Sequence, residues 1–359
     1  MNHVRHIPQT VAAFALVAFL AACNNGSTAP PVTSPPKGSQ PTTAPYSVAL
    51  ACNNPAVADY KPGETTPDRV FKLSNKQRPT AVAYDSSGNL YIGIDTDSDS
   101  WVDEYPPGST TVTRHITDGI HHPGSIVADP DGDLYVANIG ILAKNVVMYK
   151  PGSTSPDLTI NDVRYPLDLV WAQGHLWVAD NDANEVRAYH VFPDQSKAIL
   201  AWIISNDLHG PTALSTTSGN LYVLNVPFVG ADYVREYAIA NDKAPVFART
   251  INARLHYIKA IATDPDENVY LSEWSTGNSY EVAKYDLNGD FQLYVNDLYK
   301  PGSIVASGSP REFYVTESSD SGNVRLYREA GGRFVGTLKK PSSCDGHTPA
   351  KLAIMEPTP

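Results

Sequence analysis

A short motif, in which one aromatic residue stands between two apolar residues, recurs along this chain at a nearly constant interval. Its central residues are Tyr91, Tyr135, Trp177, Tyr222, Tyr270 and Tyr314. Successive members lie 44, 42, 45, 48 and 44 residues apart. A repeat of this length is typical of one four-stranded blade of a β-propeller, a unit that buries its apolar faces only against its neighbours. The sequence therefore predicts an all-β ring of blades.

Each repeat divides into four predicted strands, and the second repeat shows this most clearly. A first strand follows Pro123, an Asp/Gly turn leads to a second strand around Tyr135, a third strand ends at Tyr149, and a fourth covers residues 157–160. A tyrosine closes the third strand in every repeat, at Tyr105, Tyr149, Tyr189, Tyr237, Tyr285 and Tyr327. Six complete blades are thus expected between residues 79 and 338.

The two ends of the repeat region supply the parts of one more blade. Tyr46 and Tyr60 are 14 residues apart, as Tyr135 and Tyr149 are. Residues 68–73 then match a fourth strand, and residues 349–354 match a first strand. We therefore predict a seven-bladed β-propeller of four-stranded antiparallel blades over residues 46–355, with the seventh blade closed by both termini; a six-bladed ring is the alternative. Closure removes the free sheet edges that promote aggregation.

Two cysteines fall beside this predicted closure. Cys52 lies in the loop after the second strand of the split blade, and Cys344 lies just before its first strand. Because an oxidising compartment favours disulfides, we expect these two residues to be bridged; two unpaired thiols are the alternative.

The N-terminal segment differs from the repeats in composition. Residues 1–22 contain one charged residue and an apolar run that is too short to span a bilayer, which predicts a signal peptide. The sequence Leu-Ala-Ala-Cys at 20–23 resembles the bacterial lipobox, and this resemblance implies cleavage before Cys23 and acylation of that residue. An ordinary secretory signal with a chance cysteine is the alternative.

The segment after the predicted lipidation site reads as a spacer. Residues 23–45 are rich in Pro, Ser and Thr, which predicts a tether, and residues 356–359 form a short C-terminal tail. The expected location is the bacterial cell envelope, outside the cytoplasm, with the membrane as a partner through the lipid anchor.

The overall composition narrows the function classes. The chain of 359 residues has 27 Lys and Arg against 38 Asp and Glu, a formal net charge of −11. This balance excludes a protein that wraps a polyanion, so we expect no nucleic-acid partner. We also expect a monomer.

The repeat pattern Pro-x-x-Ile-Ala-x-Asp-x-x-Gly-x-Leu-Tyr-Val-Ala-Asn resembles NHL repeats and the gluconolactonase-like and virginiamycin B lyase-like propellers. The gluconolactonase resemblance implies a divalent ion held by acidic or amide residues beside the proline that starts each blade. Those positions here hold Thr80, Gly124, Leu167, Thr212, Ile258, Gly302 and Ala350. This departure from the pattern argues against a lactonase that uses such an ion.

The loops that precede each blade collect histidines. In a propeller these loops and those between the second and third strands surround the mouth of the central channel. The predicted ligand-binding residues in these loops are His121, His122, His209, His256, His347, Arg78 and Lys300, with Arg164 in the same register. A cationic mouth on an acidic protein indicates an anionic ligand; the alternative is that these histidines are merely solvated. We expect no metal there, because side chains spread around a ring do not converge easily.

A second ring of polar residues comes three positions after the central aromatic residues. Its acidic members are the candidate ligand-binding residues Asp180, Glu273 and Glu317, and Asn138 and Asn225 occupy the same register. The alternative is a local role, in which these side chains accept hydrogen bonds from backbone amides of a turn.

One acidic loop suggests a weak cation site. Asp95, Asp97 and Asp99 alternate as in the start of a calcium loop, but the sixth-position glycine and the twelfth-position glutamate of an EF-hand are missing. We interpret the loop as solvated, with a divalent cation as the minor alternative and no other cofactor expected.

Two classes of function remain open. The leading hypothesis is a lipid-anchored binding or scaffold module that contacts protein, peptidoglycan or a small anionic ligand through the histidine-bearing face. The alternative is a hydrolase or lyase of the lactonase or virginiamycin B lyase type, in which mouth histidines act as general bases.

Overall fold

A computed structural model of the protein describes residues 47–52, 56–61, 63–141, 143–308, 311–317, 323–339 and 349–355. The repeats lie within one compact unit, residues 43–359. The predicted signal peptide, tether and C-terminal tail lie outside the described residues, as do Cys23, Cys344 and His347. The proposed bridge from Cys52 to Cys344 and the lipidation of Cys23 therefore stay predictions.

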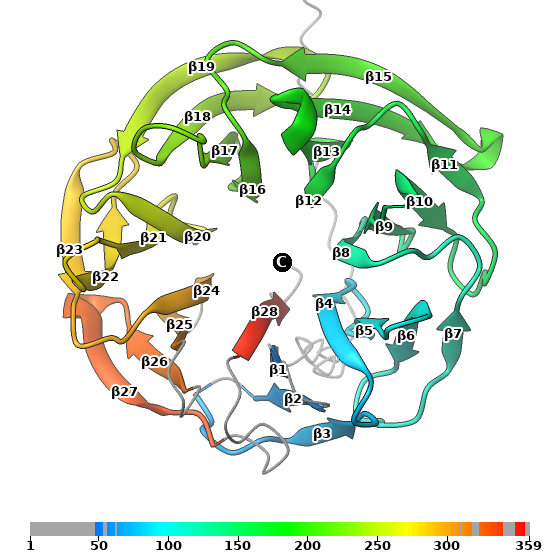
Figure 1. Ribbon diagram of the computed structural model, residues 1–359, viewed down its shortest axis with the longest axis horizontal. Helices are drawn as coiled ribbons and strands as arrows, with labels where there is room; N and C mark the ends of the chain where they lie inside the picture. Colours follow the sequence, from blue (N-terminus) through cyan, green and yellow to red (C-terminus); the bar gives the residue numbers. More distant parts are fainter. Residues whose placement is uncertain are drawn as a thin grey trace, which may run out of the picture. The chain divides into compact units, whose positions relative to one another are not determined.

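Seven four-stranded antiparallel sheets surround a central axis, which confirms the predicted seven-bladed propeller (Figure 1). The strands of each blade are called a to d from the centre outward. Blade 1 contains β4 (Arg78–Tyr84), β5 (Leu90–Asp95), β6 (Ser100–Tyr105) and β7 (Arg114–Ile116). Blade 2 contains β8 (Pro123–Ala128), β9 (Leu134–Ile139), β10 (Lys144–Tyr149) and β11 (Leu158–Ile160). Blade 3 contains β12 (Pro166–Ala172), β13 (His175–Asp180), β14 (Glu185–Phe192) and β15 (Lys197–Ile204).

The remaining blades follow the same order. Blade 4 contains β16 (Pro211–Thr216), β17 (Asn220–Asn225), β18 (Tyr233–Ala240) and β19 (Lys243–Asn252). Blade 5 contains β20 (Tyr257–Thr263), β21 (Val269–Trp274), β22 (Tyr280–Tyr285) and β23 (Phe291–Val295). Blade 6 contains β24 (Pro301–Gly308), β25 (Arg311–Glu317), β26 (Val324–Arg328) and β27 (Arg333–Thr337).

Blade 7 is built from both ends of the chain, as the sequence predicts. Its inner strand is β28 (Pro349–Met355), and its outer strands are β1 (Ser47–Cys52), β2 (Ala56–Tyr60) and β3 (Arg69–Lys72). β28 and β1 are antiparallel, with Leu50 opposite Leu352. The C-terminal strand thus closes the ring next to the axis (Figure 1).

The described helices are short 3₁₀ turns: η1 (Asn181–Ala183), η2 (Pro193–Gln195) and η3 (Ala330–Gly332). Among the described residues, no helix has the length and apolar character needed to cross a membrane.

The hydrophobic core is divided among the spaces between neighbouring blades. The central aromatic residues of the repeats fill these spaces, and each of them is almost fully buried. In one such cluster, Tyr314 of blade 6 packs with Leu50 and Leu352 of blade 7. Each blade therefore depends on its neighbours for burial, which is the physical reason for the ring.

A hydrogen-bond network shared by blades 1, 2 and 5 gives their central tyrosines a buried partner. In blade 2 the carboxylate of Asp129 accepts the amides of Asp131 and Asp133 in the turn between strands a and b, and also the hydroxyl of Tyr135. Asp85 with Tyr91 and Asp264 with Tyr270 form the same arrangement in blades 1 and 5. A buried hydroxyl usually has such a partner; among the described residues that of Tyr222 in blade 4 has none.

Candidate functional site

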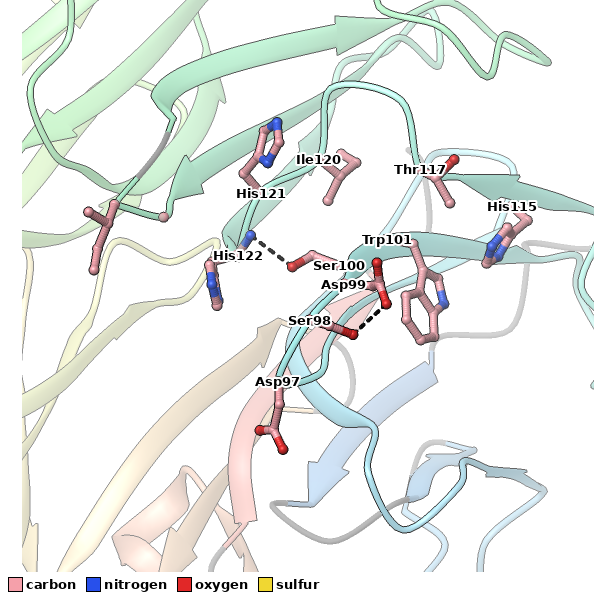
Figure 2. A pocket seen from close by; sticks show the side chains of 12 residues that line it. Asp97, Ser98, Asp99, Ser100, Trp101, His115, Thr117, Ile120, His121 and His122 are labelled. Carbon is pink, nitrogen blue, oxygen red and sulfur yellow. Dashed lines mark hydrogen bonds between the residues drawn. The ribbon is translucent and has the colours of Figure 1, made fainter.

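Two cavities lie at the mouth where blades 1 and 2 meet. The lateral cavity, about 720 Å³, is lined by Asp97, Ser98, Asp99, Ser100, Trp101, His115, Thr117, Ile120, His121, His122, Gly140 and Ile141 (Figure 2). The central cavity, about 300 Å³, is lined by Thr80, Asp95, His122, Pro123, Gly124, Ile139, Leu167 and Thr212. His122 lines both cavities, so it is the residue around which the site is built.

The imidazole of His122 is held by a buried carboxylate of the neighbouring blade. Its Nδ1 lies 2.7 Å from Oδ2 of Asp95, which ends strand β5. Because an ionised carboxylate accepts hydrogen bonds and cannot donate them, Nδ1 is the donor in this contact, and in the neutral imidazole Nε2 then has a free lone pair. An oriented imidazole of this kind can accept a proton from a substrate or from water.

The backbone of His122 is fixed as tightly as its ring. His122 has a φ of +51°, an uncommon value for a residue other than glycine. Its amide donates to Oγ of Ser100 at 3.1 Å, and its carbonyl accepts the amide of Ile139 at 3.1 Å. A Cβ on Gly140 would approach Cδ2 of His122 to 3.0 Å, so glycine leaves room for the ring. The surrounding structure therefore determines the position of the imidazole.

Asp95 connects the histidine to a hydroxyl and to a cation. Its Oδ1 accepts the hydroxyl of Ser100 at 2.8 Å. The Arg78 guanidinium lies 3.9 Å from Asp95 Oδ2 and 3.1 Å from Asp97 Oδ1. The carboxylate of Asp95 is mostly buried, whereas the side chains of Arg78 and His122 are about half exposed (54% and 55%). The site thus places a base and a cation at one solvent-accessible opening.

The other predicted mouth residues are not gathered at this place. His121 lines the lateral cavity only, and its ring points to a different side of the loop from that of His122 (Figure 2). His209 lines a separate cavity of about 720 Å³ at blades 3 and 4, together with Phe228 and Val229. His256 and Lys300 line neither cavity at blades 1 and 2. Arg164 also lies apart, and His347 is outside the described residues.

The polar residues in the ring after strand b are buried and bonded to backbone amides. Asp180 accepts the amides of Arg164 and Tyr165, Glu273 accepts the amide of Leu255, and Glu317 accepts the amide of Tyr299. Asn138 and Asn225 accept the amides of His121 and His209. Each side chain thus fixes the loop that leads into strand a of its own blade. This geometry favours the local structural role, so we leave Asp180, Glu273 and Glu317 out of the proposed site.

Glu273 gives this structural role a pH dependence. Burial raises its pKa from 4.5 to about 7. Between these values the folded protein binds more protons than the unfolded chain, so raising the pH lowers the free energy of unfolding by up to about 1.4 kcal/mol per pH unit. The contribution is complete below pH 4.5 and is lost as the pH rises through about 7. We expect Glu273→Gln to flatten this part of the stability profile, measured by urea unfolding from pH 4.5 to 8; parallel profiles would contradict the assignment.

The three aspartates of the predicted cation loop have separate partners. Asp95 bonds to His122 and Ser100, Asp97 pairs with Arg78, and Asp99 accepts the hydroxyl of Ser98 at 2.6 Å. Their carboxylates are thus already engaged in hydrogen bonds and an ion pair.

The positions beside the blade-start prolines do line the central cavity, but their donors do not suit a divalent ion. Thr80, Gly124, Leu167 and Thr212 offer two hydroxyls, a glycine and an apolar side chain. Hard divalent cations are bound mainly by carboxylates and carbonyl oxygens. We therefore derive no catalytic step through a metal at these residues.

Solved structures that share this fold include proteins described as lactonases. A candidate 6-phosphogluconolactonase from Bacteroides fragilis aligns with a TM-score of 0.67 and 14% identity, over 88% of this chain and 99% of that chain. The periplasmic gluconolactonase of Pseudomonas aeruginosa aligns with a TM-score of 0.67 and 16% identity, over 88% and 100%.

The same fold also occurs outside the lactonases. Hydrazine synthase of Kuenenia stuttgartiensis aligns with a TM-score of 0.61 and 13% identity, over 75% of this chain and 90% of that chain. No protein-family model matches the chain, and no curated protein does. The class defined by these findings is the seven-bladed propeller with a fold like that of the solved lactonases.

Sequence reasoning named Asp95 and His122 but assigned them to different sites. Asp95 was grouped with the cation loop and His122 with the ring of mouth histidines. The two residues are 27 positions apart on adjacent blades, and their contact depends on the loop conformations at both places. The sequence indicates only that the two residues lie on the same face of the propeller, since Asp95 ends strand b of blade 1 and His122 precedes strand a of blade 2.

Proposed function

We propose that this protein is a hydrolase that opens a lactone or a similar small cyclic ester, with His122 as the general base and Asp95 as its positioning residue. The observation that carries the proposal is the 2.7 Å contact that fixes the His122 ring at the junction of two cavities. The names of the solved neighbours from Bacteroides fragilis and Pseudomonas aeruginosa support the enzyme alternative over the binding module.

The proposed reaction uses the free lone pair of His122. A water molecule attacks the lactone carbonyl carbon while Nε2 takes one of its protons, which gives a tetrahedral intermediate and an imidazolium. The ring C–O bond then breaks, the imidazolium returns the proton to the leaving alkoxide, and a hydroxy acid is released. Asp95 stabilises the imidazolium and keeps the proton on Nδ1.

The surroundings of His122 favour a small polar substrate with an anionic group. Arg78 is a half-exposed cation beside the base, and an anionic substrate group would compete with Asp97 for it. Thr212 lines the central cavity, and its buried Oγ1 has no hydrogen-bond partner within the described residues. Sugar lactones that carry a phosphate or a carboxylate match these groups.

The test is hydrolysis of a panel of lactones at fixed pH. The rate is measured as the amount of alkali needed to neutralise the released acid. The panel pairs five- and six-membered sugar lactones with their phosphorylated counterparts. We expect rates above the buffer-only reaction and a preference for the anionic members. Hydrolysis of none of them by the purified full-length protein would overturn the proposal.

A binding module is the second candidate, and one observation favours it. Phe228 and Val229 are highly exposed on the loop beside His209, where their apolar side chains offer a contact surface. Isothermal titration with the hydrolysed acids separates the two functions. Saturable binding without turnover of any lactone would support the binding module.

We also propose that the enzyme works outside the cytoplasm on a lipid anchor at Cys23. The lipobox resemblance and the preceding apolar segment support this location. Incorporation of labelled palmitate into the wild type and its loss in Cys23→Ala are expected; equal labelling of both would contradict the anchor.

A further inference from the structure

A second cluster of chemically reactive side chains lies between blades 3 and 4, away from His122. His175, His190 and Asp242 each offer one ligand atom, and these atoms lie within 4.8 Å of one another. His175 begins β13, the strand whose other end, Asp180, supports the mouth loops. The cluster is therefore on the opposite face of the propeller.

The structure assigns to His175, His190 and Asp242 a binding site for a divalent transition metal of the Zn²⁺ type. Two imidazoles and one carboxylate are a ligand set that Zn²⁺ accepts, with the fourth position left for water. Because Zn²⁺ sits about 2.0–2.2 Å from each ligand, the three atoms must move closer together to bind it. Asp242 is exposed and sits in the turn between β18 and β19, so its side chain can make this adjustment.

The buried histidine is prepared for metal binding by its second nitrogen. Nδ1 of His175 lies 2.7 Å from the carbonyl oxygen of Gln173, so it carries the proton and Nε2 keeps its lone pair. A backbone carbonyl in this position is the usual outer partner of a metal-bound histidine. Gln173 has a φ of +51° and donates from its side chain to the carbonyl of Ser218 in blade 4. The turn that orients His175 is thus tied to the neighbouring blade.

The turn before His175 in blade 3 differs from the turns of blades 1, 2 and 5. Blades 1, 2 and 5 have an aspartate in the turn between strands a and b, where it bonds to the central tyrosine. In blade 3 that turn is Gln173-Gly174, His175 follows it, and Trp177 bonds to a backbone carbonyl instead. Blade 3 therefore lacks the aspartate motif of blades 1, 2 and 5, and His175 follows its shorter turn.

The other two ligands come from outer strands that are unusually long. β14 and β18 have 8 residues each, and β15 and β19 have 8 and 10, whereas β7 and β11 have 3. Figure 1 shows these long strands around the outside of blades 3 and 4. The extensions carry His190 and the Asp242 turn beyond the normal blade edge. A bound metal would link blade 3 to blade 4.

Two tryptophans beside His175 can report by their fluorescence whether the metal site is occupied. The ring centroids of Trp202 and Trp177 lie 4.6 and 6.4 Å from that of His175. Cu²⁺ and Ni²⁺ quench tryptophan fluorescence at short range and bind the same kinds of nitrogen and oxygen ligands. Quenching by these ions therefore reports on this cluster.

The experiment is titration of the full-length protein, purified without a histidine tag and treated with chelator, with ZnCl₂ in a calorimeter. We expect one Zn²⁺ per chain and a rise in melting temperature in excess Zn²⁺. His190→Ala should weaken the Zn²⁺ affinity by at least about 100-fold. Loss of a residue that only hydrogen-bonds to a metal ligand already costs about 10–100-fold, and His190 is proposed as a ligand itself. Asp242→Asn should also weaken the Zn²⁺ affinity. Asp242 lies in an exposed turn, so this substitution leaves the core intact.

The matched control is His115→Ala. His115 also lies beside a tryptophan, with its ring centroid 5.6 Å from that of Trp101, and its Nδ1 is 2.6 Å from Oδ1 of Asp103. Among the described residues, however, three side chains that could jointly hold a metal ion come together only at His175, His190 and Asp242. This variant should retain wild-type Zn²⁺ affinity and Ni²⁺ quenching. Absence of Zn²⁺ binding by the wild type would overturn the proposal. Equal Zn²⁺ affinity in wild type, His190→Ala and Asp242→Asn would also overturn it.

Discussion

Replacing His122 with alanine is expected to lower kcat/KM for lactone hydrolysis by about 10²–10⁴-fold, the usual contribution of a positioned general base. The side chain is half exposed and packs against the mouth rather than the core, so the fold should survive the change. Initial rates on the best lactone of the panel, together with melting temperatures, measure the effect.

The control for this substitution is His256→Ala. His256 occupies before blade 5 the register of His121, the neighbour of His122, is exposed, and lines neither cavity at blades 1 and 2. Its removal should leave kcat/KM within about twofold of the wild type. A general base must lie within hydrogen-bond distance of the reacting group, and His256 does not line the cavities proposed to bind the lactone. An undiminished rate in His122→Ala would show that another residue is the base.

Deleting residues 349–359 is expected to cost several kcal/mol, a loss comparable with the whole stability of a typical domain, about 5–15 kcal/mol. The deletion removes β28, the inner strand of blade 7. Leu352 is then missing from the cluster that joins Leu50 to Tyr314, and its amide no longer donates to Ser303 of blade 6. β1 also becomes an unpaired inner edge, which promotes aggregation.

The matched truncation removes residues 24–45, the predicted tether. This change should shift the urea midpoint little, because the sequence of that segment lacks an apolar pattern that could be buried. If both truncated proteins unfold at the same urea concentration, the closure of the ring by β28 does not determine its stability.

The architecture could be predicted in detail from the sequence because a blade repeat leaves periodic evidence. The spacing of aromatic residues set the number of complete blades, and the match of Tyr46 and Tyr60 to Tyr135 and Tyr149 located the split blade. The structure confirms both. A propeller blade contacts only its two neighbours, so the order of blades in the chain fixes their order in space.

The site was less predictable because it depends on contacts between loops of different blades. Register placed His122 at the mouth, but it placed His209 and His256 there equally well. His122 differs from the other mouth histidines in its contact with the carboxylate of Asp95. Asp95 lies one residue after the position in blade 1 that corresponds to Asp180 in blade 3. Nothing in the spacing of a repeat predicts how two loops turn toward each other. The cluster at His175 is hard to predict for a related reason, since its three members come from two blades.

The most direct test of the Asp95–His122 pair is a double-mutant cycle on kcat/KM with Asp95→Asn, His122→Ala and the combined variant. If Asp95 acts through the imidazole, Asp95→Asn lowers kcat/KM in the wild type but has no further effect once His122 is alanine. The coupling then equals the whole effect of the single Asp95→Asn substitution. Additive losses in the double variant would contradict the account, because the two residues would then act independently.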